Sequence, residues 1–386
     1  MNRWNVSAII VACLCLAYLF GAAAREERSS LPKAAAAPLP SAAPATKTLY
    51  EKLRAGEVVR YQIIGDSIGQ SDGKLDKPGD VWYSRLSGIL NEKYDTAAFF
   101  SRLLTTPGGI ALGGWIDYIT AAPADSDPDL FVLCFGQNDQ GTPVSAFGAS
   151  YEALVRRLKS DYPHAEIVTL IESSLSLPEY AERIRKISAY YGLLPVDTRT
   201  AFKASGVPYA SLTADGVHPN SAGYALYANA IAEAIDSRIR MPEAIRPLPA
   251  SPLYADAAAF ASGRRQSDWT RANGFDVDEH GLATGMAGDT IAQSFVGPLL
   301  GIETLADPDG GDFKVYVDGK LAATLGNHCP FPVDWEKYVS HTLSEGAHTV
   351  EIEASSGTVK IKSIIVSGNG EQAEPNERSA DEAMNL

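Results

Sequence analysis

The sequence predicts a doubly wound α/β domain, a parallel sheet with helices on both faces, followed by an all-β sandwich domain. Between residues 48 and 240, apolar β-type runs alternate with helical runs, which is typical of repeated β–α units. No stretch of helical periodicity is evident from Gly274 to Gly368, where short alternating runs are separated by glycine-containing turns. The length of 386 residues also exceeds what a single compact core usually organises.

The N-terminal segment, residues 1–24, is typical of a signal peptide or a membrane anchor. The apolar run Val6–Ala24 follows a positively charged start, and Ala22 and Ala24 provide a small-residue cleavage site. Left uncleaved, the run is just long enough to span a bilayer. In both cases we expect the body of the protein outside the cytoplasm, either secreted or anchored to the membrane. The Pro/Ala-rich residues 25–47 are expected to form an extended linker.

The first domain is predicted over residues 48–240. Its apolar run at 129–136 is nearly continuous, as in a parallel strand covered on both faces. Leu154, Val155 and Leu158 lie on one face of a predicted helix. In chain order, the expected elements are a strand at 58–65, a helix at 81–94, a glycine-rich segment at 105–115, a helix at 116–122, a strand at 129–136, a helix at 151–162, a strand at 165–173, a helix at 179–191, a strand at 193–199 and a helix at 220–235.

The second domain is predicted over residues 254–370, after a proline-rich linker at 241–253. Its hairpin signal is the Asp-Gly pair within Val317–Lys320. The polar residues 371–386 are expected to form a tail.

Composition excludes some partners. The net charge of −14 argues against a nucleic-acid partner, because phosphate binding requires a basic surface. Cys134 and Cys329 are the two cysteines outside the N-terminal segment, and they fall in different predicted domains. A disulfide framework is therefore not expected.

Polar residues gather where predicted strands of the first domain end. Carboxyl ends of parallel strands are where loops meet a ligand. A serine, a backbone-exposing glycine, an asparagine and an aspartate–histidine pair together form the inventory of an acyl-transfer site. The residues concerned are Asp66 and Ser67, Gly108 and Gly109, Asn138 and Asp139, and Asp215 and His218.

The stretch Gly65–Gly69, Gly-Asp-Ser-Ile-Gly, has three interpretations: an α/β-hydrolase nucleophile elbow, the Gly-Asp-Ser start of another serine hydrolase class, or an ordinary turn. The elbow is excluded by its position along the chain, since several strands and an oxyanion-hole loop normally precede an elbow, whereas Ser67 follows the first predicted strand. An ordinary turn leaves the other polar residues, at or near strand ends, unexplained.

The sequence resembles the SGNH, or GDSL, hydrolase superfamily over about residues 49–240. The resemblance rests on Gly65-Asp66-Ser67, on Gly108 or Gly109, on Gly136-Gln137-Asn138-Asp139 and on Asp215-Gly216-Val217-His218. It implies a flavodoxin-like sheet and a serine esterase. The asparagine or serine often found before the second-block glycine is replaced here by Thr-Pro, which leaves Gly108 and Gly109 as alternatives.

Carried over to this chain, the resemblance implies a catalytic triad. Ser67 would attack the ester carbonyl, His218 would act as base and then acid, and Asp215 would orient the imidazole. The oxyanion hole would be formed by the backbone N–H groups of Ser67 and Gly108 and by the Asn138 side chain. No metal and no cofactor are expected.

The β domain loosely resembles the jelly-roll-like carbohydrate-binding modules of extracellular esterases, on the residues Phe295–Gly297 and Val315–Gly319. Three aromatic residues are candidates for stacking on sugar or for the core: Trp269, Trp335 and Tyr338. The acidic stretch Asp307–Asp312 is interpreted as a turn, because it lacks the glutamate that a calcium loop requires. Four histidines without ligand spacing are interpreted as surface or structural residues: His280, His328, His341 and His348.

Together these observations predict an esterase that removes O-acyl groups, in particular O-acetyl groups, from an extracellular or cell-wall carbohydrate. The expected partner is an acylated carbohydrate or another small ester, with glycan contact by the β domain as an added expectation. Two alternatives stay open within the same serine chemistry. One is an O-acetyltransferase acting on a polysaccharide, and the other is a lipase or phospholipase.

Overall fold

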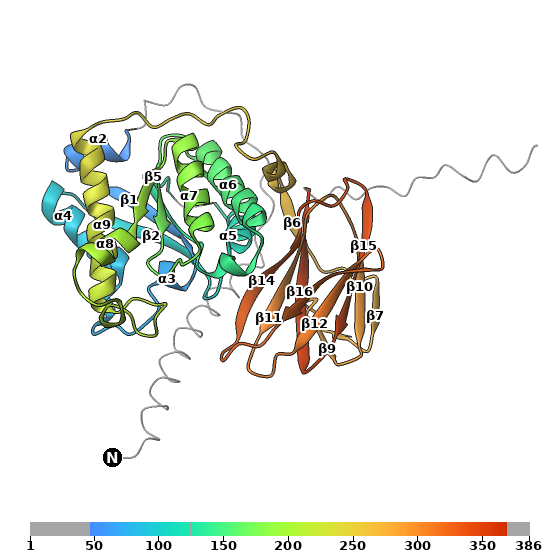
Figure 1. Cartoon of the computed structure of the whole chain (residues 1–386). Helices are drawn as coiled ribbons and strands as arrows, with labels where there is room; N and C mark the ends of the chain where they lie inside the picture. The colour runs from blue at the N-terminus through green and yellow to red at the C-terminus, as the bar shows by residue number, and fades with distance from the viewer. Residues whose placement is uncertain (1–46, 124–125, 369–386) are drawn as a thin grey trace, which may run out of the picture. The chain divides into compact units, whose positions relative to one another are not determined.

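The computed structural model describes residues 47–123 and 126–368 (Figure 1). The predicted signal peptide or anchor, nearly all of the first linker and the polar tail lie outside these residues. Among the helices in the described ranges, none combines the length and the apolar composition that crossing a membrane requires. The residue limits of the two domains stay a prediction.

The first domain is built on a five-stranded parallel sheet, which confirms the predicted doubly wound fold. In the strand order β2-β1-β3-β4-β5, β2 lies on one side of β1, and β3, β4 and β5 lie on the other. The boundary between β1 and β3 is therefore the topological switch point, and ligands of such sheets bind there, beyond the carboxyl ends of the strands. The strands are β1 (Val59–Gly65), β2 (Ala98–Thr105), β3 (Leu130–Cys134), β4 (Glu166–Ile171) and β5 (Leu194–Asp197).

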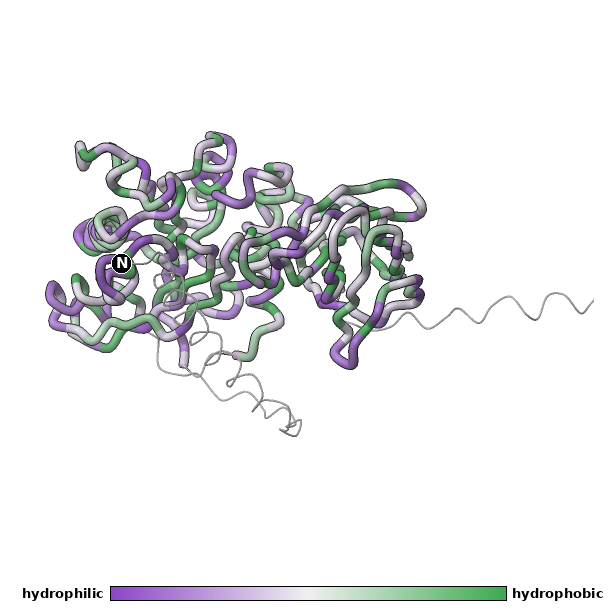
Figure 2. Tube along the Cα trace, turned by 90° about the horizontal axis from the view of Figure 1, so that it is seen from below, coloured by the Kyte–Doolittle hydropathy of each residue, from purple (hydrophilic) through white to green (hydrophobic). Residues whose placement is uncertain are grey.

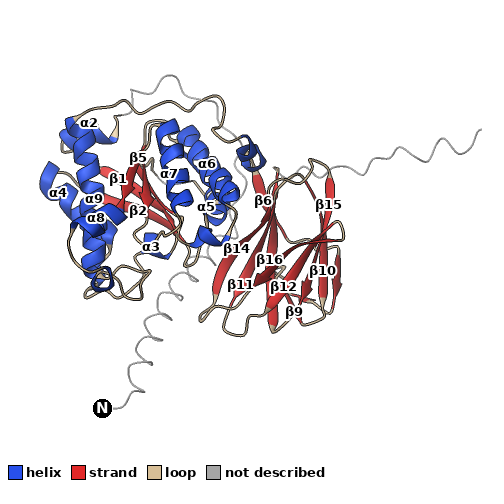
Figure 3. Ribbon diagram, in the orientation of Figure 1, coloured by secondary structure: helices blue, strands red, loops and turns tan. Residues whose placement is uncertain are grey.

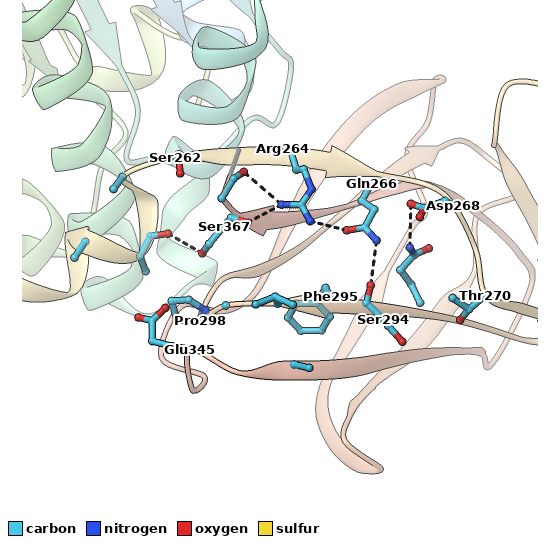
Figure 4. Close-up of a pocket in the computed structure, with 18 residues that line it drawn as sticks. Ser262, Arg264, Gln266, Asp268, Thr270, Ser294, Phe295, Pro298, Glu345 and Ser367 are labelled. Carbon is cyan, nitrogen blue, oxygen red and sulfur yellow. Dashed lines mark hydrogen bonds between the residues drawn. The ribbon is translucent and has the colours of Figure 1, made fainter. Parts of the chain in front are cut away.

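Helices cover both faces of this sheet (Figure 3). Alternate residues of β3 separate the two cores: Leu130 and Val132 pack with one set of helices, and Phe131 and Leu133 with the other. The first core includes residues of α2 (Leu49–Arg54), α4 (Trp82–Tyr94), α8 (Thr198–Ala204) and α9 (Ser221–Arg240), and the second includes residues of α5 (Ala111–Thr120), α6 (Val144–Asp161) and α7 (Pro178–Tyr191). Short elements complete the domain: α3 (Ser67–Gln70), η1 (Pro78–Asp80), η2 (Asn138–Gly141) and η3 (Tyr209–Ser211).

Strand β2 was missed by the sequence analysis. It lies at the edge of the sheet, and its side chains Phe99 and Phe100 are 41% and 36% exposed. Because apolar residues of this strand face solvent, neither a continuous buried run nor a clean alternation marks it. The helix predicted at 116–122 was placed too late, since α5 already begins at Ala111.

The second domain is all-β, as predicted, with two antiparallel sheets in the orders β13-β12-β15-β10-β7 and β14-β11-β16-β9-β8. Alternate residues of β15 (Ala347–Ala354) are buried. Figure 2 shows the hydropathy of each described residue along the chain. The predicted turn joins β12 and β13, with positive φ at Asp318 and Gly319. The other elements are η4 (Ala255–Phe260), β6 (Gly263–Gln266), which pairs with β16, β7 (Arg271–Asn273), β8 (Asp276–Val277), β9 (Ala283–Met286), β10 (Thr290–Val296), β11 (Leu300–Ala306), β12 (Asp312–Val317), β13 (Lys320–Gly326), β14 (Val333–Ser340) and β16 (Thr358–Ser367).

Candidate active site

The Gly-Asp-Ser stretch forms a tight junction between β1 and α3. A Cβ on Gly65 would lie 2.8 Å from the Cβ and the carbonyl oxygen of Cys134, so glycine lets β1 pack against the end of β3. Asp66 caps α3, and its Oδ1 accepts the N–H groups of Ile68 at 2.8 Å and of Gly69 at 3.3 Å. Ser67 is therefore the first residue of α3, held by the turn at the carboxyl end of a central strand.

A chain of hydrogen bonds runs from Ser67 to the loop before α9. His218 Nε2 lies 2.9 Å from Ser67 Oγ, and His218 Nδ1 lies 2.7 Å from Asp215 Oδ2. The other oxygen, Asp215 Oδ1, accepts the backbone N–H groups of Val217 at 2.9 Å and His218 at 2.8 Å. A hydroxyl bonded to an imidazole that is itself oriented by a carboxylate is the arrangement that activates a serine.

Asp215 is kept ionised by its surroundings. Partial burial acts to raise the pKa of its carboxyl, but the hydrogen bonds from the His218 ring and from the backbone of His218 and Val217 outweigh it and lower the pKa to about 2. The carboxylate is thus available to stabilise a charged imidazole over the neutral pH range.

The turn Thr106–Gly109 distinguishes the two candidate glycines. The N–H of Gly109 donates to the carbonyl oxygen of Thr106 at 2.8 Å, which closes the turn. Gly108 has φ of +75°, as the third residue of a type II turn requires. Within the described part of the chain, the N–H groups of Gly108 and Ser67 donate to no protein acceptor. Of the two glycines, Gly108 is therefore the one whose N–H has no acceptor among the described residues.

Asn138 joins the two loops that carry these N–H groups. Its Nδ2 donates to Asp66 Oδ2 at 2.9 Å and to the carbonyl oxygen of Gly109 at 3.1 Å. Asp66 and Gly109 are the chain neighbours of Ser67 and Gly108, so the amide brings the candidate oxyanion donors together. An oxyanion bound by Asn138 would take over one of these two contacts.

Three acidic side chains lie buried around these loops: Asp66, Asp139 and Glu172. Burial is the largest cause that raises the pKa of each carboxyl, to about 7 for Asp139, with repulsion from Glu172 as a further cause for Asp66 and Asp139. Asp139 Oδ1 accepts the N–H of Ala111, the first residue of α5, at 2.9 Å. Asp139 was among the candidate residues predicted from the sequence, whereas Glu172 was not.

Trp335, on β14, contacts the turn that carries Gly108. Its indole Nε1 donates to the carbonyl oxygen of Pro107 at 2.6 Å, and a Cβ on Gly108 would lie 2.6 Å from the same nitrogen. Of the other aromatic candidates, Trp269 donates to the carbonyl oxygen of Gly281 at 3.1 Å, and Tyr338 lies 2.7 Å from a nitrogen of His341. All three side chains make structural contacts.

Comparison with known proteins identifies the first domain. Residues 63–226 match the model of the GDSL-like Lipase/Acylhydrolase family. The chain carries a GDSL-like acylhydrolase domain. The protein is accordingly a carboxylic ester hydrolase. None of the curated proteins is similar in sequence.

Two solved structures match both domains. One is a crystal structure of a two-domain esterase active on acetylated mannans, 19% identical, with a TM-score of 0.66 over 83% of this chain and 94% of that chain. The other is the same esterase co-crystallised with mannopentaose, 20% identical, with a TM-score of 0.65 over 84% of this chain and 94% of that chain. The similarity shows that the GDSL domain and the β domain of this chain have the folds of the two domains of that esterase.

The structure brings the predicted site residues to one place. Hydrogen bonds connect Ser67 with His218 and Asp215, and others link Asn138 to Asp66 and Gly109. Glu172 directly follows β4, but the strand predicted at 165–173 includes it, so the rule that selected the other residues, a polar side chain after a predicted strand, passed over it. The contact between Trp335 and Pro107 joins residues 228 positions apart, and no local pattern in the sequence marks it.

Proposed function

We propose that this GDSL-type hydrolase removes O-acyl groups, in particular O-acetyl groups, from a carbohydrate outside the cytoplasm. The observation that carries the proposal is the unbroken hydrogen-bond chain Ser67–His218–Asp215 at the carboxyl end of β1. In this proposal Ser67 is the nucleophile, His218 the general base and acid, and Asp215 the residue that orients the imidazole.

In the first step, Ser67 Oγ attacks the ester carbonyl while His218 Nε2 takes the hydroxyl proton. The negative charge that develops on the carbonyl oxygen is bound by the N–H groups of Ser67 and Gly108 and by the amide of Asn138. His218 then donates its proton to the leaving sugar hydroxyl. The products of this step are a free hydroxyl on the carbohydrate and an acyl group on Ser67.

In the second step, a water molecule gives a proton to His218 Nε2 and attacks the acyl group on Ser67. The same donors bind the second oxyanion, and the proton returns to Ser67 Oγ as the carboxylic acid leaves. Asp215 stays ionised throughout, which agrees with its lowered pKa of about 2.

Two observations support an acetylated polysaccharide as the substrate. The two-domain structure that matches 83% of this chain belongs to an esterase active on acetylated mannans. The match covers the β domain as well as the GDSL domain, and a second domain beside the site favours a long substrate over a small ester. The location outside the cytoplasm rests on the apolar segment at residues 6–24.

The test is release of acetate from acetylated mannan, measured with and without an added glycan acceptor. We expect acetate release without acceptor, and we expect a serine-directed phosphonate to label Ser67. The variant Ser67→Ala should neither release acetate nor be labelled by the phosphonate. The control Ser84→Ala, at a half-buried serine on α4, should release acetate and be labelled like the wild type. Release that requires an acceptor would favour the acetyltransferase, and a phosphonate adduct elsewhere would refute the mechanism.

A further inference from the structure

Two buried carboxyls, Asp66 and Glu172, lie next to Ser67 and take no part in the proposed chemistry. Asp66 follows β1 and Glu172 follows β4, and both side chains are fully inaccessible to solvent. Cys134 lies between them, on β3. Three atoms lie within 4.8 Å of one another: a carboxyl oxygen of Asp66, a carboxyl oxygen of Glu172 and the sulfur of Cys134. The two acids are thus in reach of each other, and one of them, Asp66, directly precedes the nucleophile in the chain.

Each acid holds a different part of the candidate oxyanion hole. Asp66 accepts the N–H groups of Ile68 and Gly69, which fixes the turn of Ser67, and its other oxygen accepts Asn138 Nδ2 at 2.9 Å. Glu172 Oε2 accepts the N–H of Gln137, the residue before Asn138, at 2.7 Å. Glu172 Oε1 accepts the thiol of Cys134 at 3.2 Å.

The charge of this pair is not balanced by a lysine or an arginine. Within the described residues, neither Asp66 nor Glu172 forms an ion pair with lysine or arginine. Two ionised carboxylates at such close range, both enclosed away from solvent, repel each other strongly. The pair avoids this repulsion when one proton is held between the two acids, as in other close carboxyl pairs.

We propose that Asp66 and Glu172 share one proton, and that this carboxyl pair positions the oxyanion hole around Ser67. Asp66 carries the proton and donates it to Glu172, so the negative charge lies on Glu172, away from the Asn138 amide that faces the oxyanion. Burial, followed by repulsion from Glu172, raises the pKa of Asp66 well above its usual range, which agrees with this assignment. Both acids are positioning residues, and their effect on the reaction rests on the proposed esterase function.

The pair predicts a loss of activity as the pH rises through the raised pKa of Asp66. As the pH rises through the raised pKa of Asp66, the shared proton is lost, the two carboxylates repel each other and a charge lies next to the Asn138 amide. The titratable groups that face the pair from the elements around it are Cys134 on β3, Asp139 on η2, Tyr151 on α6, Tyr224 and Tyr227 on α9, and His218.

The kinetic test is Glu172→Gln, with Glu166→Gln as the matched control at the start of the same strand, β4. A glutamine amide can donate to Asp66, which then ionises beside Asn138. We expect kcat to fall by about 10²-fold, the scale of a misplaced catalytic group, with KM unchanged and the high-pH limb of the kcat profile altered. Glu166→Gln should keep the wild-type kcat profile. An unchanged profile in Glu172→Gln would overturn the proposal.

A second measurement does not need activity and so separates this proposal from the esterase function. In the wild type, native Asp66 holds its proton above the pH at which the unfolded aspartate loses it. The free energy of unfolding therefore falls as pH rises from about 4 toward the native pKa. Glu172→Gln should make this fall smaller and shift it to lower pH, since Asp66 no longer faces a second acid.

If the free energy of unfolding changes with pH in the same way in the wild type and in Glu172→Gln, no proton is shared between the two acids, whatever the activity. A bound metal is the rival explanation for the cluster of Asp66, Cys134 and Glu172. Wild-type protein that contains a stoichiometric metal ion, and whose pH dependence changes when a chelator removes that ion, would also overturn the proposal. Metal-free protein with the expected curves supports it.

Discussion

Ser67 lies between two groups of carboxyls whose environments differ. On the side of the loop before α9, the side chain of Asp215 is 54% exposed, accepts three hydrogen bonds and has a pKa of about 2. On the side of the sheet, Asp66 and Glu172 are buried and their pKa values are raised, first of all by burial. Hydrogen bonding and solvent keep one acid charged, whereas burial and a second acid keep a proton on the other.

This difference separates two tasks. In the proposed mechanism, a charged carboxylate next to His218 stabilises the imidazolium that forms when Ser67 gives up its proton. A neutral carboxyl next to Asn138 supports the donors without adding negative charge where the oxyanion develops. Exchanging the two environments would weaken both the stabilisation of the imidazolium and the binding of the oxyanion. Substitutions that change either Asp215 or the oxyanion-hole residues, one at a time, can therefore test the comparison.

The largest expected effect is on the charged side. Asp215→Asn should lower kcat by about 10⁴-fold, because the amide no longer holds the His218 ring in the required tautomer. Asp76→Asn, an exposed aspartate of the same domain, is the control and should leave kcat unchanged. Hydrolysis of a soluble acetyl ester measures both variants. A loss of less than tenfold in Asp215→Asn would show that Asp215 does not orient the base.

The next largest effect is on the side of the oxyanion hole. Asn138→Ala removes an amide donor and should lower kcat by roughly 10²–10³-fold with little change in KM. Labelling of Ser67 by the phosphonate should slow as well, because the phosphonyl oxygen occupies the same hole. An increase in KM alone would instead place Asn138 in substrate binding.

Much of the site could be predicted from the sequence because its residues follow strands with a recognisable apolar pattern. Ser67 and Asn138 lie within four residues of the ends of such strands, and Asp215 and His218 lie within one short loop. Strand β2 could not be predicted, since its exposed edge residues Phe99 and Phe100 hide the pattern.

The opposite pKa shifts could not be predicted either. Asp66 and Asp215 are both aspartates in loops, and the sequence does not show that one is enclosed next to Glu172 while the other faces solvent. Only the packing of β1, β3 and β4 brings Asp66, Cys134 and Glu172 together. The contact of Trp335 with Pro107 is equally a product of packing, because it joins distant parts of the chain.

A smaller effect concerns stability and Asp139. Burial is the main cause that raises its pKa to about 7, and its Oδ2 has no hydrogen-bond partner in the described residues. The native state therefore keeps this proton where the unfolded chain loses it, so the free energy of unfolding falls as pH rises from about 4 to about 7. Asp139→Asn should flatten this part of the curve. Urea unfolding at several pH values measures it, and an unchanged slope would contradict the assignment.

The smallest expected effect tests whether the oxyanion side of Ser67 depends on the β domain. Trp335→Phe keeps an aromatic ring against Gly108 but removes the hydrogen bond from Nε1 to the carbonyl oxygen of Pro107. Loss of a bond of about 1 kcal/mol should lower kcat by about fivefold if the bond holds the turn in the form that binds the oxyanion. Trp269→Phe loses a similar bond, to Gly281, far along the chain from the turn, and should leave kcat unchanged. Equal kcat values for the two variants would mean that the Thr106–Gly109 turn is fixed by its own hydrogen bond and by Asn138, so that the positioning of the oxyanion donors is a property of the GDSL domain alone.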